Sequence, residues 1–184
     1  MGSKSLYEEK SSNQLKQRLL ARGKDFTNPW IWLNCNNFKS AISGDMMEQT
    51  SLELRGGCPV VFGAKFTEKV LADFSYKGKI YEYDFLKVLD GSKQEVDFRE
   101  NENIIMWNIN VSNKTSKIEV SFVCDKKSMS KVNHENPRGE KSRTELWNGQ
   151  HAKGIVKLYE KRDSRYVLID ELYGKNGGCE FGHY

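Results

Sequence analysis

The segment from Trp30 to Phe38 alternates large aromatic and carboxamide side chains with apolar ones. If it forms a β-strand, its period of two places Trp30, Trp32, Asn34 and Asn36 on one face. Aromatic walls with a few amides are the usual lining of a small-molecule site. Alternatively, Asn34 and Asn36 bond only to neighbouring backbone, because a buried amide left without partners costs roughly 1–3 kcal/mol. The pattern predicts a strand that is covered on both faces, with either a ligand pocket or backbone-bonded amides on the face that carries the tryptophans.

Carboxylates on strands with apolar neighbours are candidates for general-acid chemistry. Glu171 alternates with Val167 and Ile169 in one predicted strand. Asp84 and Glu82 alternate with aromatic side chains in another, and the alternative for this pair is a solvent-exposed face. Glu171 and Asp84 are therefore candidate acids without a surrounding catalytic motif.

Metal, phosphate and nucleophile motifs do not occur in the sequence. The three histidines are scattered, and the four cysteines (Cys35, Cys58, Cys124 and Cys179) lack metal-ligand spacing. There is no phosphate-binding loop and no nucleophile elbow. We therefore expect no metal and no cofactor, and reduced thiols typical of a cytoplasmic protein.

The chain has 184 residues, 38% hydrophobic and 29% charged, which is typical of a globular protein with a real core. Its 29 basic and 25 acidic residues give a net charge of +4. The basic residues between positions 126 and 143 are interleaved with glutamates, so we expect a solvated loop and no nucleic-acid partner. No apolar run approaches the ~18 residues of a transmembrane helix, and no secretory signal is visible.

Period-two segments dominate after Gly23, and only positions 11–22 show the apolar stripe of a short, basic amphipathic helix. Turn residues predict hairpins over positions 70–88, 104–124 and 154–173. Nine or ten short strands in such an order predict an all-β fold, either an up-and-down antiparallel β-barrel or a strongly curved sandwich. A barrel of about 8–10 strands has room for one small ligand. The stretch from 125 to 150 is predicted to be an irregular lid or loop.

The sequence GKDFTNPWIWLNCNNF at positions 23–38 resembles a block in the second half of plant and cyanobacterial tocopherol cyclases, GK-x-F-x-x-x-W-x-W-x-x-C-N-x-F. Weaker similarity continues through an aromatic hairpin (YKGKIYEYDF), a W-x-I segment at 106–109, a Gly-x-x-x-Leu strand at 154–158 and the Gly-rich end at 168–182. We therefore divide the chain into an N-terminal extension, 1–22, and a tocopherol-cyclase-like barrel domain, 23–184.

The resemblance implies a cofactor-free isomerase (an intramolecular lyase) that closes the chromanol ring of a prenylated hydroquinone. In this chemistry a protonated carboxyl group adds a proton to an alkene, and the phenol oxygen then attacks the resulting cation. Glu180, Glu171 and Asp84 are the candidate acids. The aromatic side chains that would stabilise the cation are Trp30, Trp32, Tyr81, Tyr83 and Trp107, and Asn34 and Asn36 would orient the quinol oxygens.

Members of that family have two lipocalin-like β-barrel halves, and this chain resembles only the second, which implies one antiparallel lipocalin-like β-barrel of about 8–10 strands. It is either an excised domain, whose partner is a missing N-terminal half, or a short relative that is competent alone. The alternative function is non-catalytic, lipocalin-like binding of a hydrophobic or quinone-like molecule, which needs the pocket but no acid. In both cases we expect a cytoplasmic protein, either free in the cytoplasm or peripheral to a membrane.

Overall fold

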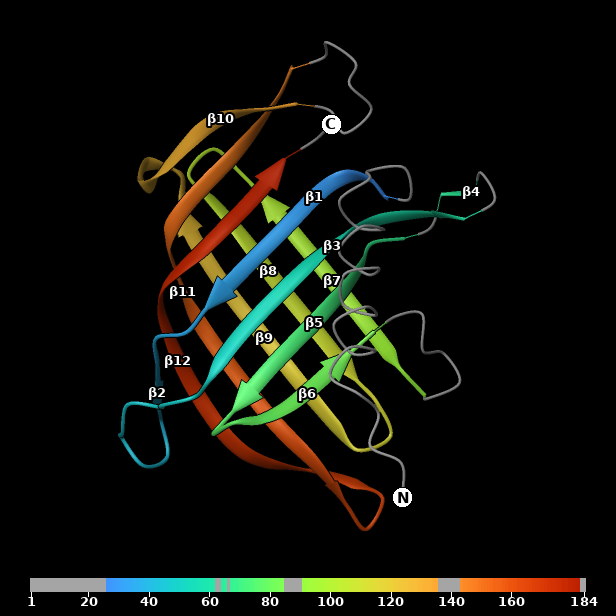
Figure 1. The fold of residues 1–184 in the computed structure, drawn as a ribbon, viewed down its shortest axis with the longest axis vertical. Helices are drawn as coiled ribbons and strands as arrows, with labels where there is room; N and C mark the ends of the chain where they lie inside the picture. The colour runs from blue at the N-terminus through green and yellow to red at the C-terminus, as the bar shows by residue number, and fades with distance from the viewer. Residues whose placement is uncertain (1–25, 62–63, 66, 85–90, 136–142, 183–184) are drawn as a thin grey trace, which may run out of the picture.

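The computed structural model describes residues 26–61, 64–65, 67–84, 91–135 and 143–182. Strands make up nearly all of this part of the chain, and the one helical element in it is a 3-10 turn, Lys126–Ser128 (Figure 1). The strands are β1 (Phe26–Cys35), β2 (Phe38–Ser40), β3 (Ser51–Val61), β4 (Ala64–Lys65), β5 (Lys69–Tyr76), β6 (Lys79–Tyr83), β7 (Lys93–Glu100), β8 (Ile104–Ser112), β9 (Ser116–Asp125), β10 (Met129–Glu135), β11 (Arg143–Arg162) and β12 (Arg165–Gly182).

The strands form one antiparallel sheet in the order β6-β5-β3-β1-β12-β11-β9-β8-β7, with β2, β4 and β10 paired at its sides. Figure 1 shows that this sheet curls so that β8 and β9 lie behind β1 and β3. The predicted fold class, an all-β antiparallel barrel, is confirmed. The predicted helix at positions 11–22 lies outside the described residues.

Three hairpins form where the turn residues predict them, although the described part of the first ends at Asp84. Lys77 and Gly78 connect β5 to β6, and both have positive φ angles, 51° and 81°. Asp163 and Ser164, with φ angles of 46° and 69°, connect β11 to β12. Two consecutive positive φ values are the geometry of a tight hairpin turn that matches the twist of its strands.

The prediction of an irregular lid between positions 125 and 150 is wrong. Strand β10 pairs with the first part of β11, from Met129↔Gly149 to Glu135↔Arg143. Strand β12 also continues past its predicted end through the glycines at 174, 177 and 178 to Gly182. Charged and glycine-rich segments thus form strands here because neighbouring strands provide hydrogen-bond partners along their whole length.

The inner faces of the strands pack into one hydrophobic cluster. Gly154 and Gly174 are opposite one another on β11 and β12, and both lie close to Phe122 of β9. A Cβ atom on Gly154 would lie 2.1 Å from the carbonyl oxygen of Ser121 and 2.6 Å from the Cα of Phe122. Side chains from adjacent strands therefore fill the space that these glycines leave.

A side chain joins the edge strand β7 to β5, which is next to the opposite edge strand β6. The Gln94 amide on β7 donates to the carbonyl oxygen of Val70 on β5 at 2.7 Å, and its oxygen accepts from the Val70 N–H at 3.0 Å. This pair of bonds imitates one step of a β-ladder. Gln94 thereby brings β7 against β5 without a paired strand between them.

Candidate functional site

One face of β1 packs into the core, and the tryptophans and amides lie on the opposite, outer face. Ile31 and Leu33 are fully buried in the hydrophobic cluster. Trp30 and Trp32 are half-buried on the outer face, beside Glu180 of β12, which is the cross-strand partner of Trp32. The prediction that this face is covered like the inner one is wrong, because the sheet curls toward the smaller aliphatic side chains.

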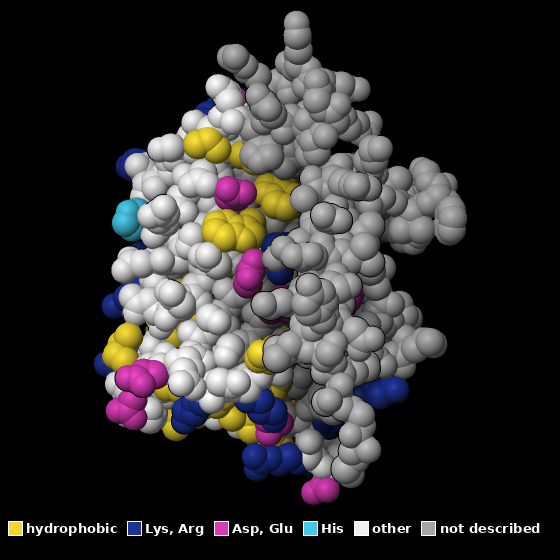
Figure 2. Space-filling view, in the orientation of Figure 1, with side chains coloured by type: hydrophobic (Ala, Val, Ile, Leu, Met, Phe, Trp, Pro, Cys, Tyr) yellow, Lys and Arg dark blue, Asp and Glu magenta, His cyan; other side chains and the backbone are white. Residues whose placement is uncertain are grey.

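Glu180 is the centre of a polar and aromatic cluster on the outer face. One carboxylate oxygen accepts a hydrogen bond from Trp30 Nε1 at 3.0 Å, and the other accepts from Asn148 Nδ2 at 2.8 Å. Asn148 on β11 is also the cross-strand partner of Glu180. Figure 2, which views the face formed by β1, β3 and β12, shows hydrophobic side chains and acidic groups side by side there.

The two amides of β1 differ in what they contact. Asn34 Oδ1 accepts from the backbone N–H of Gly178 at 2.9 Å, which is the backbone-bonded alternative. Gly178 also lies under the ring of Trp32, since a Cβ atom at this position would be 3.1 Å from the ring. Asn36 is exposed. Asn34 thus joins β1 to the glycine-rich part of β12, and Asn36 belongs to no cluster.

Beside the Glu180 cluster, Arg55 of β3 is the cross-strand partner of Trp32. Its guanidinium forms ion pairs with Glu53 at 3.3 Å and Asp73 at 3.4 Å. Both carboxylates are about half exposed, so these pairs add little stability. The outer face at this point is therefore a mixed surface of aromatic and charged groups.

The other three aromatic candidates lie in the interior. Tyr81 and Tyr83 of β6 are 7% and 2% exposed, and Trp107 of β8 is fully buried. Tyr83 donates to Ser116 Oγ at 3.0 Å, and burial raises the pKa of its phenol. Tyr81 donates to Glu160 at 2.7 Å. The fold therefore separates the candidate aromatic residues into an outer pair and an inner group of three.

Trp107 carries a buried donor that no described residue satisfies. No hydrogen-bond acceptor among the described residues lies within reach of Trp107 Nε1. The indole lies between Phe98 and Phe122, which are its cross-strand partners on β7 and β9. Buried polar groups are nearly always hydrogen-bonded, so an unpaired indole N–H inside a sheet points to an acceptor from elsewhere.

Of the other candidate acids, Glu171 lies on the outer face and forms an ion pair with Lys157 at 3.3 Å. Asp84 is 6% exposed and therefore does not share an exposed face with Glu82. The strand alternation does not apply to it, because β6 ends at Tyr83. The structure does not bring Glu180, Glu171 and Asp84 together, since two lie on the outer face and one is buried.

Sequence reasoning missed Asp170, which is 4% exposed. Its carboxylate accepts from the Ser40 hydroxyl at 2.8 Å, the Tyr76 hydroxyl at 3.0 Å and the N–H of Glu171 at 2.8 Å. Burial and the hydrogen bond to Asp170 raise the pKa of Tyr76 to about 12. A signal was present, because Asp170 alternates with Leu168 and Leu172 along the strand.

The four cysteines form no disulfide bond, and all four are buried. Cys124 of β9 and Cys179 of β12 come from either side of Gly149 on β11, which lacks the side chain that would keep them apart. The contact between the two thiols lowers the pKa of Cys124 and raises that of Cys179. No group of three or more His, Cys, Asp or Glu residues in the described ranges is arranged to hold a metal ion.

The chain matches no family model, no curated protein and no solved structure in the three comparisons that we made. The resemblance to tocopherol cyclases thus stays a hypothesis that rests on the sequence block at 23–38. Among the described residues there is no helix with the length and apolarity that crossing a membrane requires.

Proposed function

We propose that this protein binds one small, mainly apolar molecule inside the curled sheet, as a lipocalin-like barrel does. The observation that carries the proposal is the fully buried indole N–H of Trp107, for which the described residues provide no acceptor. A buried donor without an acceptor costs roughly 1–3 kcal/mol. A ligand with a carbonyl or hydroxyl oxygen at this point would remove that cost.

The surroundings of Trp107 suggest the rest of the ligand. Phe98 and Phe122 flank the indole in register, and both pack with the hydrophobic cluster. Such an environment favours a flat or branched apolar body, with one acceptor directed at the indole nitrogen. A quinone-like molecule with an apolar substituent has this character, which agrees with the ligand class expected from the sequence.

The arrangement of the carboxylates favours binding over catalysis. An acid that protonates an alkene must hold a proton in a dry site. Glu180 instead accepts hydrogen bonds at both oxygens, and Glu171 is paired with Lys157. Both lie on the outer face, away from Trp107. Acid-catalysed ring closure therefore stays a prediction, with Asp84 as the buried acid among the three candidates.

Calorimetric titration with a short-chain prenylated benzoquinone tests the proposal. We expect saturable one-to-one binding, and a loss of affinity of roughly tenfold in Trp107→Phe, because one hydrogen bond to the ligand disappears. Trp30→Phe is the matched control, since it removes an indole N–H on the outer face, and its affinity should equal that of the wild type.

A second arm needs no variant. A hydrocarbon analogue of the same shape without the quinone oxygens should bind the wild-type protein about tenfold more weakly than the quinone. Absence of saturable quinone binding, or equal affinities for the quinone and its hydrocarbon analogue, would overturn the proposal.

A further inference from the structure

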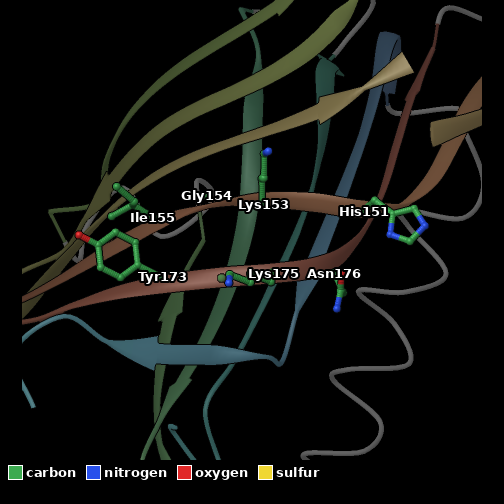
Figure 3. A pocket seen from close by; sticks show the side chains of 8 residues that line it. His151, Lys153, Gly154, Ile155, Tyr173, Lys175 and Asn176 are labelled. Carbon is green, nitrogen blue, oxygen red and sulfur yellow. The ribbon is translucent and has the colours of Figure 1, made fainter. Parts of the chain in front are cut away.

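A groove of about 370 Å³ lies across the outer faces of β11 and β12, on a different part of the sheet from the Glu180 cluster. Figure 3 shows the side chains that line it, which come from both strands. Its lining residues are His151, Lys153, Gly154, Ile155, Tyr173, Gly174, Lys175 and Asn176.

The register of the two strands explains the groove. Ile155 and Tyr173 are direct cross-strand partners, and the adjacent pair is Gly154 with Gly174. Both glycines face inward toward Phe122, so Ile155 and Tyr173 are the side chains that project outward here. One residue further along, the register shifts and Asn176 adopts a positive φ of 55°, which is the geometry of a bulge. The bulge interrupts the regular pairing of the outer surface beside an apolar and an aromatic side chain.

The charged residues that line this groove, Lys153 and Lys175, are both basic, and the nearby Glu171 accepts a hydrogen bond from the Tyr173 hydroxyl at 3.4 Å. Lys153 and Lys175 are exposed in the groove, and Lys39 of β2 is the cross-strand partner of Tyr173. None of these three lysines forms an ion pair with a carboxylate in the part of the chain that the structure describes. The nearest acid on the strand, Glu171, is already paired with Lys157.

Unpaired ammonium groups next to an apolar surface suit a particular class of molecule. Lysines provide the positive charge and hydrogen-bond donors that a phosphate or carboxylate requires. Ile155 is partly buried and Tyr173 is 44% exposed, so both offer apolar area to the body of a ligand. Inorganic phosphate would use only the first of these features.

We propose that the groove is a binding site for an anionic amphiphile, a molecule with one phosphate or carboxylate headgroup and a short apolar chain. Lys153 and Lys175 bind the headgroup, and Ile155 and Tyr173 contact the chain. Lys39 adds positive charge at the same edge. The site is independent of the interior ligand proposed above, since it lies on the opposite face of the sheet.

Calorimetry with octyl phosphate, inorganic phosphate and octanol tests the proposal. We expect octyl phosphate to bind at least tenfold more tightly than either of the other two, because only it uses both features of the groove. The variant Lys153→Gln/Lys175→Gln should lose about tenfold in affinity for octyl phosphate. Tyr173→Ser should lower the affinity for octyl phosphate and leave that for inorganic phosphate unchanged.

The control is Lys93→Gln/Lys114→Gln, which removes the same amount of charge at two exposed positions. Lys93 is the first residue of β7, and Lys114 follows the end of β8. Its affinity should match that of the wild type. An equal loss in both double variants would mean general charge attraction and would overturn the proposal. So would equal affinities for octyl phosphate and inorganic phosphate.

The same headgroup chemistry occurs in free amphiphiles and in membrane lipids, and vesicle sedimentation separates these sources. If the natural source is a lipid, vesicles with phosphatidylglycerol should retain the wild-type protein and not the Lys153→Gln/Lys175→Gln variant. If the source is a free amphiphile, neither protein should sediment, while octyl phosphate still binds the wild type. Failure of the wild type to bind both probes would overturn the site, whatever the result with the interior quinone.

Discussion

The two faces of β1 use opposite kinds of side chain. On the inner face, Ile31 and Leu33 have no exposed surface and pack with aliphatic side chains of neighbouring strands. On the outer face, Trp30 and Trp32 are half-buried and surround the carboxylate of Glu180. The larger aromatic side chains of this strand are therefore outside, and the smaller aliphatic ones are inside.

This difference follows from the curvature of the sheet. When a sheet curls, side chains on the concave face converge and those on the convex face spread apart. Beside Gly154 and Gly174 the inner face is crowded, because Cβ atoms at these two positions would lie within 2.6 Å of atoms in β9. Indole rings on β1 fit better outside, where the neighbouring Gly178 leaves room for Trp32.

The largest expected effect comes from truncation on the inner face. Leu33→Ala should lower the free energy of unfolding by about 2–5 kcal/mol, because it leaves a cavity in a well-packed core. Asn36→Ala, three residues away and exposed on the outer face, should change it by less than about 0.5 kcal/mol. Denaturant titration of both variants measures the contrast, and equal losses would contradict our assignment of the faces.

Alkaline pH should lower the free energy of unfolding through two tyrosines, the buried Tyr83 and the partly buried Tyr76. Burial raises the pKa of Tyr83, and burial with the Asp170 contact raises that of Tyr76 to about 12 from an ordinary value of 10. The folded state then keeps protons that the unfolded state loses. The free energy of unfolding is therefore unaffected by these groups below pH 10 and falls as pH rises toward 12.

The variant Tyr83→Phe isolates the inner contribution to this pH dependence. It keeps the ring in the core, and Ser116 Oγ retains its bond to Asn113 Oδ1 at 3.2 Å. We expect unfolding titrations across the same alkaline window to give a shallower decline than in the wild type. Tyr173→Phe, an exposed change on the outer face, is the control. A wild-type slope in Tyr83→Phe would show that the inner phenol does not contribute.

Much of the fold could be predicted from local sequence. The turns at Gly78 and at Asp163–Ser164 have residue types that tolerate positive φ, so the hairpins were visible in the sequence. Strand β10 and the glycine-rich end of β12 were not, because their pairing partners rather than their own residues make them strands.

The site was less predictable because alternation shows which residues share a face but not which face is inside. Trp30, Trp32 and Asn34 do share a face, yet aromatic content suggested a pocket where the structure has an outer surface. The partners of Glu180 could not be inferred either, since Asn148 belongs to a segment expected to be a loop. Trp107, by contrast, lies inside a regular alternating strand, and its burial follows the pattern.

The smallest effect concerns the outer face alone and tests whether the Glu180 cluster is a coupled unit. Trp30→Phe removes the donor to one carboxylate oxygen and keeps most of the ring, while Glu180→Gln leaves a single acceptor oxygen in place of two. Each change alone should lower the free energy of unfolding by about 0.5–1.5 kcal/mol, since the groups are only half-buried.

If the indole and the carboxylate interact directly, the double variant should lose less than the sum, with a coupling of about 0.5–1 kcal/mol. The matched cycle of Trp30→Phe with Asn36→Ala should be additive, because Asn36 contacts neither group. Additivity in both cycles would mean that the contact between Trp30 and Glu180 contributes nothing, and that the outer tryptophans are held by packing over β12 alone.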